Sequence, residues 1–137
     1  MRPAAPIDDP AVRAEVEAAF AAYEAALIAN DAARLGQFFW DDPRAVRYGL
    51  AENLQGAAEI AAFRAARAGG DLARELARTT ITSFGRDFAT ACTLFRRRES
   101  GRTGRQMQAW ARLPEGWRIV AAHVSFLDFP WDFPWPD

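Results

Sequence analysis

Apolar positions at helical spacing mark the first element of the chain. They are separated by four, four, three and four residues and form one stripe: Val12, Val16, Phe20, Tyr23 and Leu27. Asp9 is suited to cap this helix, and Pro10 is suited to its first position. The pattern therefore predicts an amphipathic helix that begins after Asp9 and ends at the break formed by Asn30-Asp31.

A short second helix and a short β-like segment are predicted next. Asp31 is suited to cap a helix that carries three apolar residues: Leu35, Phe38 and Phe39. Asp41-Asp42-Pro43 is typical of a turn. Residues 45–54 then favour extended structure, with Gly49 inside the segment.

A third helix and four strand-like runs complete the pattern. Gly56 opens a helix over residues 57–68, and Gly69-Gly70 closes it. The four runs are joined by short, turn-rich connectors and cover residues 72–84, 88–98, 105–113 and 117–129. Connectors of this length predict an antiparallel meander.

Helices followed by a long meander are typical of an α+β domain. We expect a single domain over residues 1–137, with a core at about 9–127 and a tail rich in proline and tryptophan at 128–137. About three helices on one face of a strongly curved antiparallel sheet would form a cone around a tapering cavity. The other face of the sheet would be free to pair with a second copy in a two-fold homodimer.

Composition narrows the choice of partners and compartment. The chain has 137 residues and a net charge of −1, and every basic residue is arginine, without a basic stripe that would indicate nucleic acid. Its single cysteine excludes an internal disulfide, and its single histidine excludes a histidine-rich metal site, so no metal or other cofactor is expected. Residues 1–10 do not resemble a signal peptide, and no apolar run approaches the roughly 20 residues of a membrane span. We therefore expect a cytoplasmic protein that binds no membrane.

Tyr23 is the first candidate for chemistry because it lies within the apolar stripe of the first helix. Its phenol is carried toward the core or the cavity, where a hydroxyl needs a partner. A structural tyrosine that bonds to the backbone and a tyrosine that takes part in chemistry both fit this position.

Two arginines of the third predicted helix are also candidates. Ile60 and Phe63 define its apolar face, and Arg67 returns almost beneath Ile60, with Arg64 at the flank. An arginine at such a place extends to solvent along apolar surface, pairs with a carboxylate, or faces a wet cavity. All three alternatives stay open from the sequence.

Arg47 and Gln108 lie in predicted strands. A guanidinium at Arg47 can present a planar fork to a carboxylate, although a strand arginine commonly faces solvent. Gln106, Gln108 and Trp110 share one face of their strand, but an uncertainty of one residue in the following turn leaves open which face lines the cavity. Gln108 is thus a candidate pocket residue.

His123 and Cys92 are the remaining reactive side chains. His123, on the last predicted strand, suits either a general acid or base near neutral pH or a structural role. Cys92 lies in an apolar strand without basic residues nearby, which favours a small buried hydrophobic residue over a nucleophile.

Several segments together resemble a known family. They are Arg47-Tyr48-Gly49, Glu52-Asn53-Leu54, Phe63-Arg64 with Arg67, Gly104-Arg105-Gln106 with Gln108 and Trp110, and the run Gly-Trp-Arg-Ile-Val-Ala-Ala-His-Val-Ser at residues 116–125. This set resembles the AtzH-like family, also called the oxalurate-catabolism HpxZ-like family, within the SnoaL-like or nuclear-transport-factor-2-like superfamily. The resemblance extends from about Val12 to Phe126, whereas the tail is not part of it.

The resemblance implies a decarboxylating amidohydrolase of cyanuric-acid and ureide catabolism. Its substrate would be a small carboxylated urea such as dicarboxyurea, converted to allophanate with loss of ammonia and carbon dioxide. The residues held to be essential in that family correspond to Tyr23 and Arg47, which are the catalytic candidates. Arg64, Arg67, Gln108 and His123 are the candidates for binding the anionic substrate.

Two other functions remain open at this point. One is a small-anion-binding accessory protein that assists an amidase partner without catalysis. The other is an isomerase or cyclase of the same fold, a chemistry that needs a buried carboxylate base in an apolar cavity. The inward-facing candidates here are tyrosine and arginine, which favours a small anion.

Overall fold

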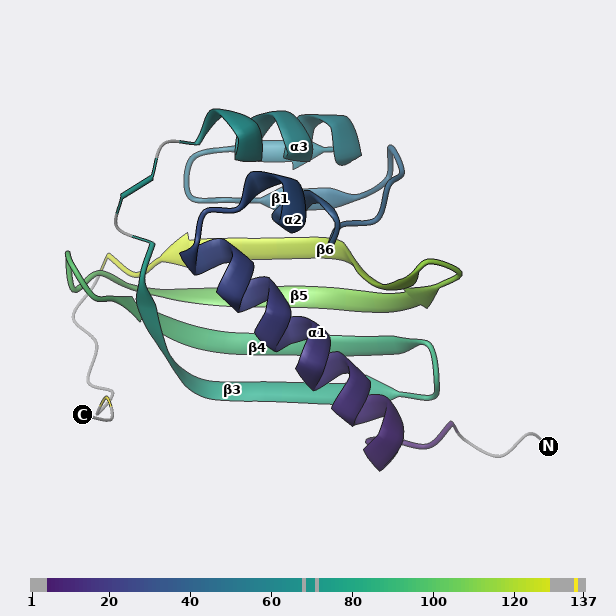
Figure 1. The fold of residues 1–137 in the computed structure, drawn as a ribbon. Helices are drawn as coiled ribbons and strands as arrows, with labels where there is room; N and C mark the ends of the chain where they lie inside the picture. Colours follow the sequence, from purple (N-terminus) through teal and green to yellow (C-terminus); the bar gives the residue numbers. More distant parts are fainter. Residues whose placement is uncertain (1–4, 68, 71, 129–134, 136–137) are drawn as a thin grey trace.

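Three helices lie on one side of a twisted sheet in the computed structural model, which describes residues 5–67, 69–70, 72–128 and 135 (Figure 1). The helices are α1 (Pro10–Ile28), α2 (Ala32–Gly36) and α3 (Ala57–Ala66). Helix α1 crosses the sheet diagonally, and α2 and α3 lie together near the opposite edge (Figure 1). None of the described helices is long and apolar enough to cross a membrane.

The sheet contains six strands in the described part of the chain. They are β1 (Val46–Tyr48), β2 (Asn53–Gln55), β3 (Arg74–Phe84), β4 (Phe88–Arg97), β5 (Thr103–Leu113) and β6 (Gly116–Phe126), in the order β2-β1-β6-β5-β4-β3. Strands β3 to β6 form the predicted antiparallel meander. The segment predicted as one β-like stretch forms two strands, and β1 pairs parallel to β6. The α+β architecture is confirmed.

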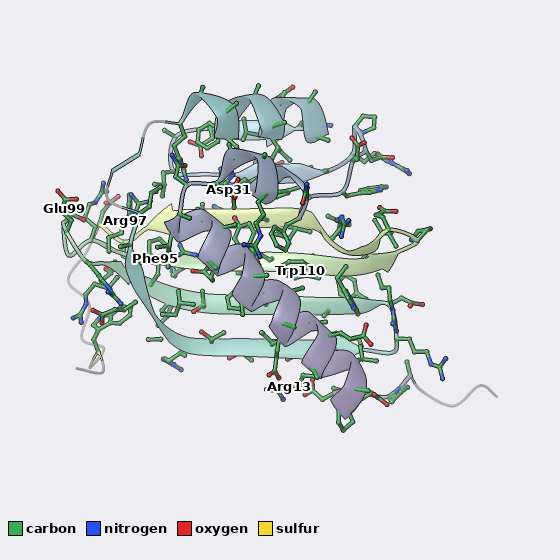
Figure 2. The ribbon with its side chains drawn as sticks, viewed as in Figure 1. Arg13, Asp31, Phe95, Arg97, Glu99 and Trp110 are labelled. Atoms are coloured by element: carbon green, nitrogen blue, oxygen red, sulfur yellow. The ribbon has the colours of Figure 1, made fainter. Side chains whose placement is uncertain are left out.

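Helix α1 begins as its sequence predicts. The Asp9 carboxylate accepts hydrogen bonds from the backbone N–H groups of Ala11 and Val12, and Pro10 occupies the first turn. All members of the apolar stripe are buried, among them Val16 and Tyr23. They pack against the inner face of the sheet, where Phe95 and Trp110 are also fully buried (Figure 2).

A bulge in β6 decides which residues of this strand face inward. Trp110 pairs with Ile119 and Ala109 pairs with Ala121, so Val120 is an extra residue on β6. Trp117 and Ile119 are buried on the inner face, but beyond the bulge the buried position is Val124. A strict alternation from Ile119 would have turned His123 inward, whereas the bulge turns it outward.

The predicted division into a core and a tail at residue 128 stays a prediction. Most of residues 128–137 fall outside the described part of the chain. Within it, the guanidinium of Arg96 lies 5.1 Å from the centre of the Trp135 ring.

Candidate functional site

A small cavity lies between the C-terminal half of α1 and the sheet. Its free volume is about 20 Å³, which accommodates roughly one water molecule. The described residues that line it are Tyr23, Leu27, Arg47, Leu50, Arg67, Leu72, Arg74, Arg97, Gln106 and Val124. Tyrosine, glutamine and several arginines therefore meet in one place.

Tyr23 lines this cavity and is bonded to Arg64, which lies outside the lining. The Nη2 group of Arg64 donates a hydrogen bond of 2.8 Å to the phenol oxygen of Tyr23. The ring packs edge-on against Phe38 and Phe39, with centroid distances of 5.8 and 6.2 Å. The oxygen acts as an acceptor here, so the hydroxyl hydrogen of Tyr23 is available to another acceptor.

Arg64 is the most deeply buried charged residue of the described set, with 1% of its surface exposed. Its Nε and Nη1 groups are buried and have no hydrogen-bond partner among the described residues. Burial lowers the pKa of the Arg64 guanidinium, and the neighbouring charge of Arg47 adds to this effect. A buried cation without a carboxylate partner is costly unless a ligand supplies the negative charge.

Arg67 reaches the same cavity by a different route from the one expected. Helix α3 ends at Ala66 instead of residue 68, and Arg67 itself has an extended backbone. Its guanidinium lies 5.0 Å from the centre of the Phe63 ring. Burial, followed by the charges of Arg64, Arg47 and Arg97, lowers the pKa of Arg67 to about 10, so this side chain is still a cation at neutral pH.

Arg47 is held by a carboxylate and an aromatic ring. Its Nη1 group donates a hydrogen bond of 2.8 Å to Oε1 of Glu52, and its guanidinium lies 5.3 Å from the Phe63 centroid. A side chain at Gly49 would collide with this carboxylate and with the Arg47 guanidinium, which explains the glycine between β1 and β2. Burial raises the pKa of Glu52, but the hydrogen bonds from Arg47 and the Ala51 backbone outweigh it and lower the pKa below its ordinary value.

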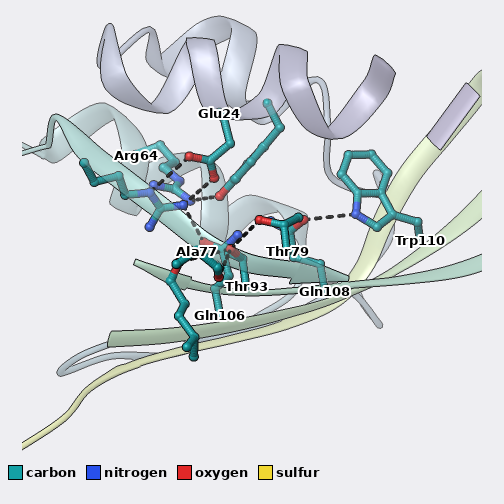
Figure 3. A network of polar contacts seen from close by, with 11 residues as sticks. Glu24, Arg64, Ala77, Thr79, Thr93, Gln106, Gln108 and Trp110 are labelled. Atoms are coloured by element: carbon teal, nitrogen blue, oxygen red, sulfur yellow. Dashed lines mark hydrogen bonds and ion pairs between the residues drawn. The ribbon is translucent and has the colours of Figure 1, made fainter. Parts of the chain in front are cut away.

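A second buried ion pair was not predicted from the sequence. Arg74 donates to both carboxylate oxygens of Glu24 and also to Oε1 of Gln106, the last at 2.9 Å. Figure 3 shows Glu24, Arg64 and Gln106 converging from α1, α3 and β5. Glu24 follows Tyr23 at the edge of the apolar stripe, and no short-range pattern signals its partner on β3, 50 residues away.

Gln108 and His123 do not join this cluster. Gln108 is buried on the inner face of the sheet, so the face of β5 that carries Gln106, Gln108 and Trp110 is the one turned toward the helices. The Oε1 atom of Gln108 accepts a hydrogen bond of 3.0 Å from the Trp110 indole. His123 lies on the outer face next to Tyr48, at a centroid distance of 6.1 Å, because of the bulge at Val120. The structure thus places Tyr23, Arg47, Arg64 and Arg67 together and places His123 on the opposite side of the sheet.

Two of the other hollows lie apart from this cluster of polar residues. A larger one, about 720 Å³, lies between α2, α3 and the β5–β6 turn and is lined in part by Trp40, Ile60 and Arg118. The other, about 310 Å³, lies on the outer face of the sheet beside Cys92 and Met107. Burial raises the pKa of the Cys92 thiol, which keeps it protonated and disfavours a nucleophilic role. No group of residues that would hold a metal ion occurs in the described ranges.

The charges at the small cavity do not balance. Arg47 and Arg74 each have a carboxylate partner, Glu52 and Glu24 respectively. Arg64 and Arg67, in contrast, form no ion pair with any described residue. Arg67 at the cavity and Arg64, bonded to the Tyr23 phenol, therefore carry positive charge that no described carboxylate balances, an arrangement suited to a small anion.

Solved structures share this fold. A protein of unknown function from the DUF3225 family of Pectobacterium atrosepticum is 51% identical over 92% of this chain and 100% of its own, with a TM-score of 0.88. A cystatin-like fold protein from Burkholderia xenovorans is 46% identical over 91% and 98% of the two chains, with a TM-score of 0.86. A ketosteroid isomerase-like protein from Erwinia carotovora atroseptica covers 85% of this chain and 96% of its own at 19% identity and a TM-score of 0.66, which supports the fold alone.

Curated proteins and family models complete the comparison. No curated protein matches the chain. The AtzH-like family model matches residues 5–129, nearly the whole of the described region. Structural neighbours described as nuclear-transport-factor-2-like agree with this match. Because the family model covers nearly the whole chain, the chain belongs to the AtzH-like family.

Proposed function

We propose that the protein is a decarboxylase that removes one carboxylate, as carbon dioxide, from a small carboxylated urea such as dicarboxyurea. The observation that carries this proposal is the Tyr23 phenol next to two arginines, Arg64 and Arg67, that have no carboxylate partner among the described residues. A flat dianion matches two guanidinium groups in charge and in shape. Membership of the AtzH-like family supports the same substrate class.

Atom balance corrects the reaction that the family resemblance implies, in which ammonia was also lost. Dicarboxyurea and allophanate contain the same number of nitrogen atoms, so their interconversion releases carbon dioxide and no ammonia. The N–C bond to one carboxylate breaks, its electron pair stays on the nitrogen, and that nitrogen takes up one proton. Ammonia would appear only from a substrate with an additional amide, such as a carboxylated biuret, after attack by water.

Tyr23 is the proton donor in this proposal. Its oxygen already accepts the hydrogen bond from Arg64, so its own hydrogen is directed elsewhere, and Tyr23 lines the cavity. Proton transfer to the departing nitrogen leaves a phenolate that the Arg64 cation stabilises, and water then restores the proton. General acid catalysis of this kind contributes about 10²–10⁴-fold to a rate.

Arg47 has an orienting role in this scheme. Glu52 occupies its Nη1 group, so the remaining donors of Arg47 are those available to a substrate carboxylate. The Phe63 ring lies within 5.3 Å of both the Arg47 and the Arg67 guanidinium, which holds the two cations at a defined place.

Substrate binding requires the cavity to widen. Its free volume corresponds to about one water molecule, which is less than a dicarboxylate needs. Leu50 is 37% exposed and Arg67 is half-buried, so both of these lining side chains have room to move. The anion would then lie beside Arg67 and the Tyr23 phenol, and its charge would also offset that of Arg64 behind Tyr23.

An accessory anion-binding protein that assists an amidase is the alternative, because the excess of positive charge alone would also serve it. An isomerase is less well supported, because the buried carboxylate of Glu24 is bound by Arg74 and is not a free base.

The test is turnover of dicarboxyurea by the purified protein, followed as allophanate and carbon dioxide above the spontaneous rate in buffer. We expect catalysis by the wild type and its loss in Arg64→Met, with Arg34→Met as the control because Arg34 is exposed on α2 and is not bonded to Tyr23. Binding without turnover in the wild type would favour the accessory protein. Neither binding nor turnover would refute both functions.

A further inference from the structure

Gln106 presents an amide group whose orientation is defined by its partner. Its Oε1 accepts a hydrogen bond of 2.9 Å from Nη2 of Arg74. A guanidinium has only donors, so the oxygen and not the nitrogen of the amide must face Arg74. The NH₂ group of Gln106 is therefore turned away from Arg74.

Arg74 acts as a rigid anchor for this amide. Its Nε and Nη2 groups both donate to the carboxylate of Glu24, and its guanidinium lies 4.6 Å from the centre of the Phe95 ring. Arg74 and Glu24 are 7% and 8% exposed. Because its charge is already neutralised, Arg74 is better suited to hold Gln106 than to bind a second anion.

The amide nitrogen of Gln106 lacks a partner. Nε2 is buried and forms no hydrogen bond with any described residue, although Gln106 lines the cavity together with Tyr23 and Arg67. A buried donor without an acceptor destabilises a protein unless something else fills that place. A ligand in the cavity would supply the acceptor.

We propose that Gln106 recognises the urea itself: its NH₂ group donates a hydrogen bond to the central carbonyl oxygen of the substrate. This inference rests on the proposed function. The arginines bind carboxylates and do not distinguish one dicarboxylate from another, whereas a neutral donor in a fixed position suits a neutral carbonyl. A dicarboxylate without a central carbonyl leaves Nε2 of Gln106 unpaired. Gln106 therefore determines the preference for ligands that have this carbonyl.

Two dianions, one with and one without a central carbonyl, test this role by binding, with the β-keto acid freshly dissolved because such acids slowly lose carbon dioxide in water. 3-Oxoglutarate has the same chain of atoms as dicarboxyurea, with CH₂ in place of NH, and glutarate also lacks the carbonyl. Calorimetry on the wild type should show about tenfold tighter binding of 3-oxoglutarate than of glutarate, as expected for one buried donor that is satisfied. In Gln106→Met the preference should disappear, because 3-oxoglutarate loses the hydrogen bond from Nε2 and then binds about as weakly as glutarate.

The chain offers a matched control in Gln108, the next inward-facing residue of β5. Its amide is bonded to Trp110 and does not line the cavity, so Gln108→Met should keep the preference. If Gln106→Met does not fold, Gln106→Glu retains an oxygen for Arg74 and removes the donor, and should also lose the preference. A wild type that binds both dianions equally, or a Gln106 variant that retains the preference, would overturn the inference alone. A wild type that binds neither would overturn the proposed function and the inference together.

Discussion

Replacement of Tyr23 by phenylalanine separates packing from chemistry. Tyr23→Phe keeps the ring and its edge-on contacts with Phe38 and Phe39, and removes only the oxygen that accepts from Arg64. The variant also leaves every nitrogen of the Arg64 guanidinium without a hydrogen-bond partner among the described residues, since Nε and Nη1 have none in the wild type.

The expected cost follows from the charge of the lost donor. A hydrogen bond to a charged group contributes about 1.5–3 kcal/mol, so we expect the free energy of unfolding to fall by about 2 kcal/mol. In a domain of this size that corresponds to a decrease in Tm of roughly 7 °C. Removal of a proton donor should also reduce the turnover of dicarboxyurea by about 100-fold or more, with the affinity for the anion little changed.

Calorimetric melting, anion titration and carbon dioxide release on the same preparation measure these three effects. Tyr48→Phe is the matched control, because Tyr48 is 47% exposed on the outer face and should change none of them substantially. Equal turnover in Tyr23→Phe and the wild type would refute the catalytic assignment of Tyr23. An unchanged Tm would refute the energetic role given to its bond with Arg64.

Three further expectations concern Arg47, Glu52 and the outer face. Arg47→Lys keeps the charge and loses the fork, so the kcat/KM for dicarboxyurea should fall by about tenfold or more in steady-state kinetics. The folded-state pKa of Glu52 is lowered from 4.5, so the pairing of Glu52 with Arg47 stabilises the protein above that value, and this stabilisation is lost as the pH falls through the folded pKa. Glu52→Gln should therefore lower Tm at neutral pH and much less at about pH 3. An equal decrease in Tm at both pH values would contradict this. Met107 is 61% exposed in the apolar groove with Tyr48 and Cys92, so we expect a homodimer through this face of the sheet. Light scattering should give twice the 15.2 kDa mass of the chain for the wild type and a monomer for Met107→Glu, and a wild-type monomer would contradict the expectation.

Local patterns were sufficient for most of the fold. The stripe from Val12 to Leu27 predicts α1 because burial of one helix face depends on spacing alone. The short connectors predict the β3–β6 meander because such turns allow only antiparallel neighbours. The parallel pairing of β1 with β6 was not predicted, since it joins segments about 75 residues apart for which no local signal exists.

The site was predictable only in part for the same reason. Tyr23 was found because it belongs to a helix stripe, Arg67 because it returns beneath Ile60 on the predicted third helix, and Arg47 with the help of the family resemblance. His123 was misplaced because one extra residue, Val120, reverses the alternation of β6. The contacts of Gln106 and Glu24 with Arg74 depend on where α1 crosses the sheet, which no spacing in the sequence specifies.

The central claim is that the protein decarboxylates a carboxylated urea at this cavity. Quantification of all reaction products tests this claim most directly. Carbon-labelled dicarboxyurea incubated with the protein should give allophanate and carbon dioxide in equal amounts, without ammonia, and faster than in buffer or with Arg64→Met. Release at the rate of the buffer control, or the same rate with Arg64→Met as with the wild type, would contradict it.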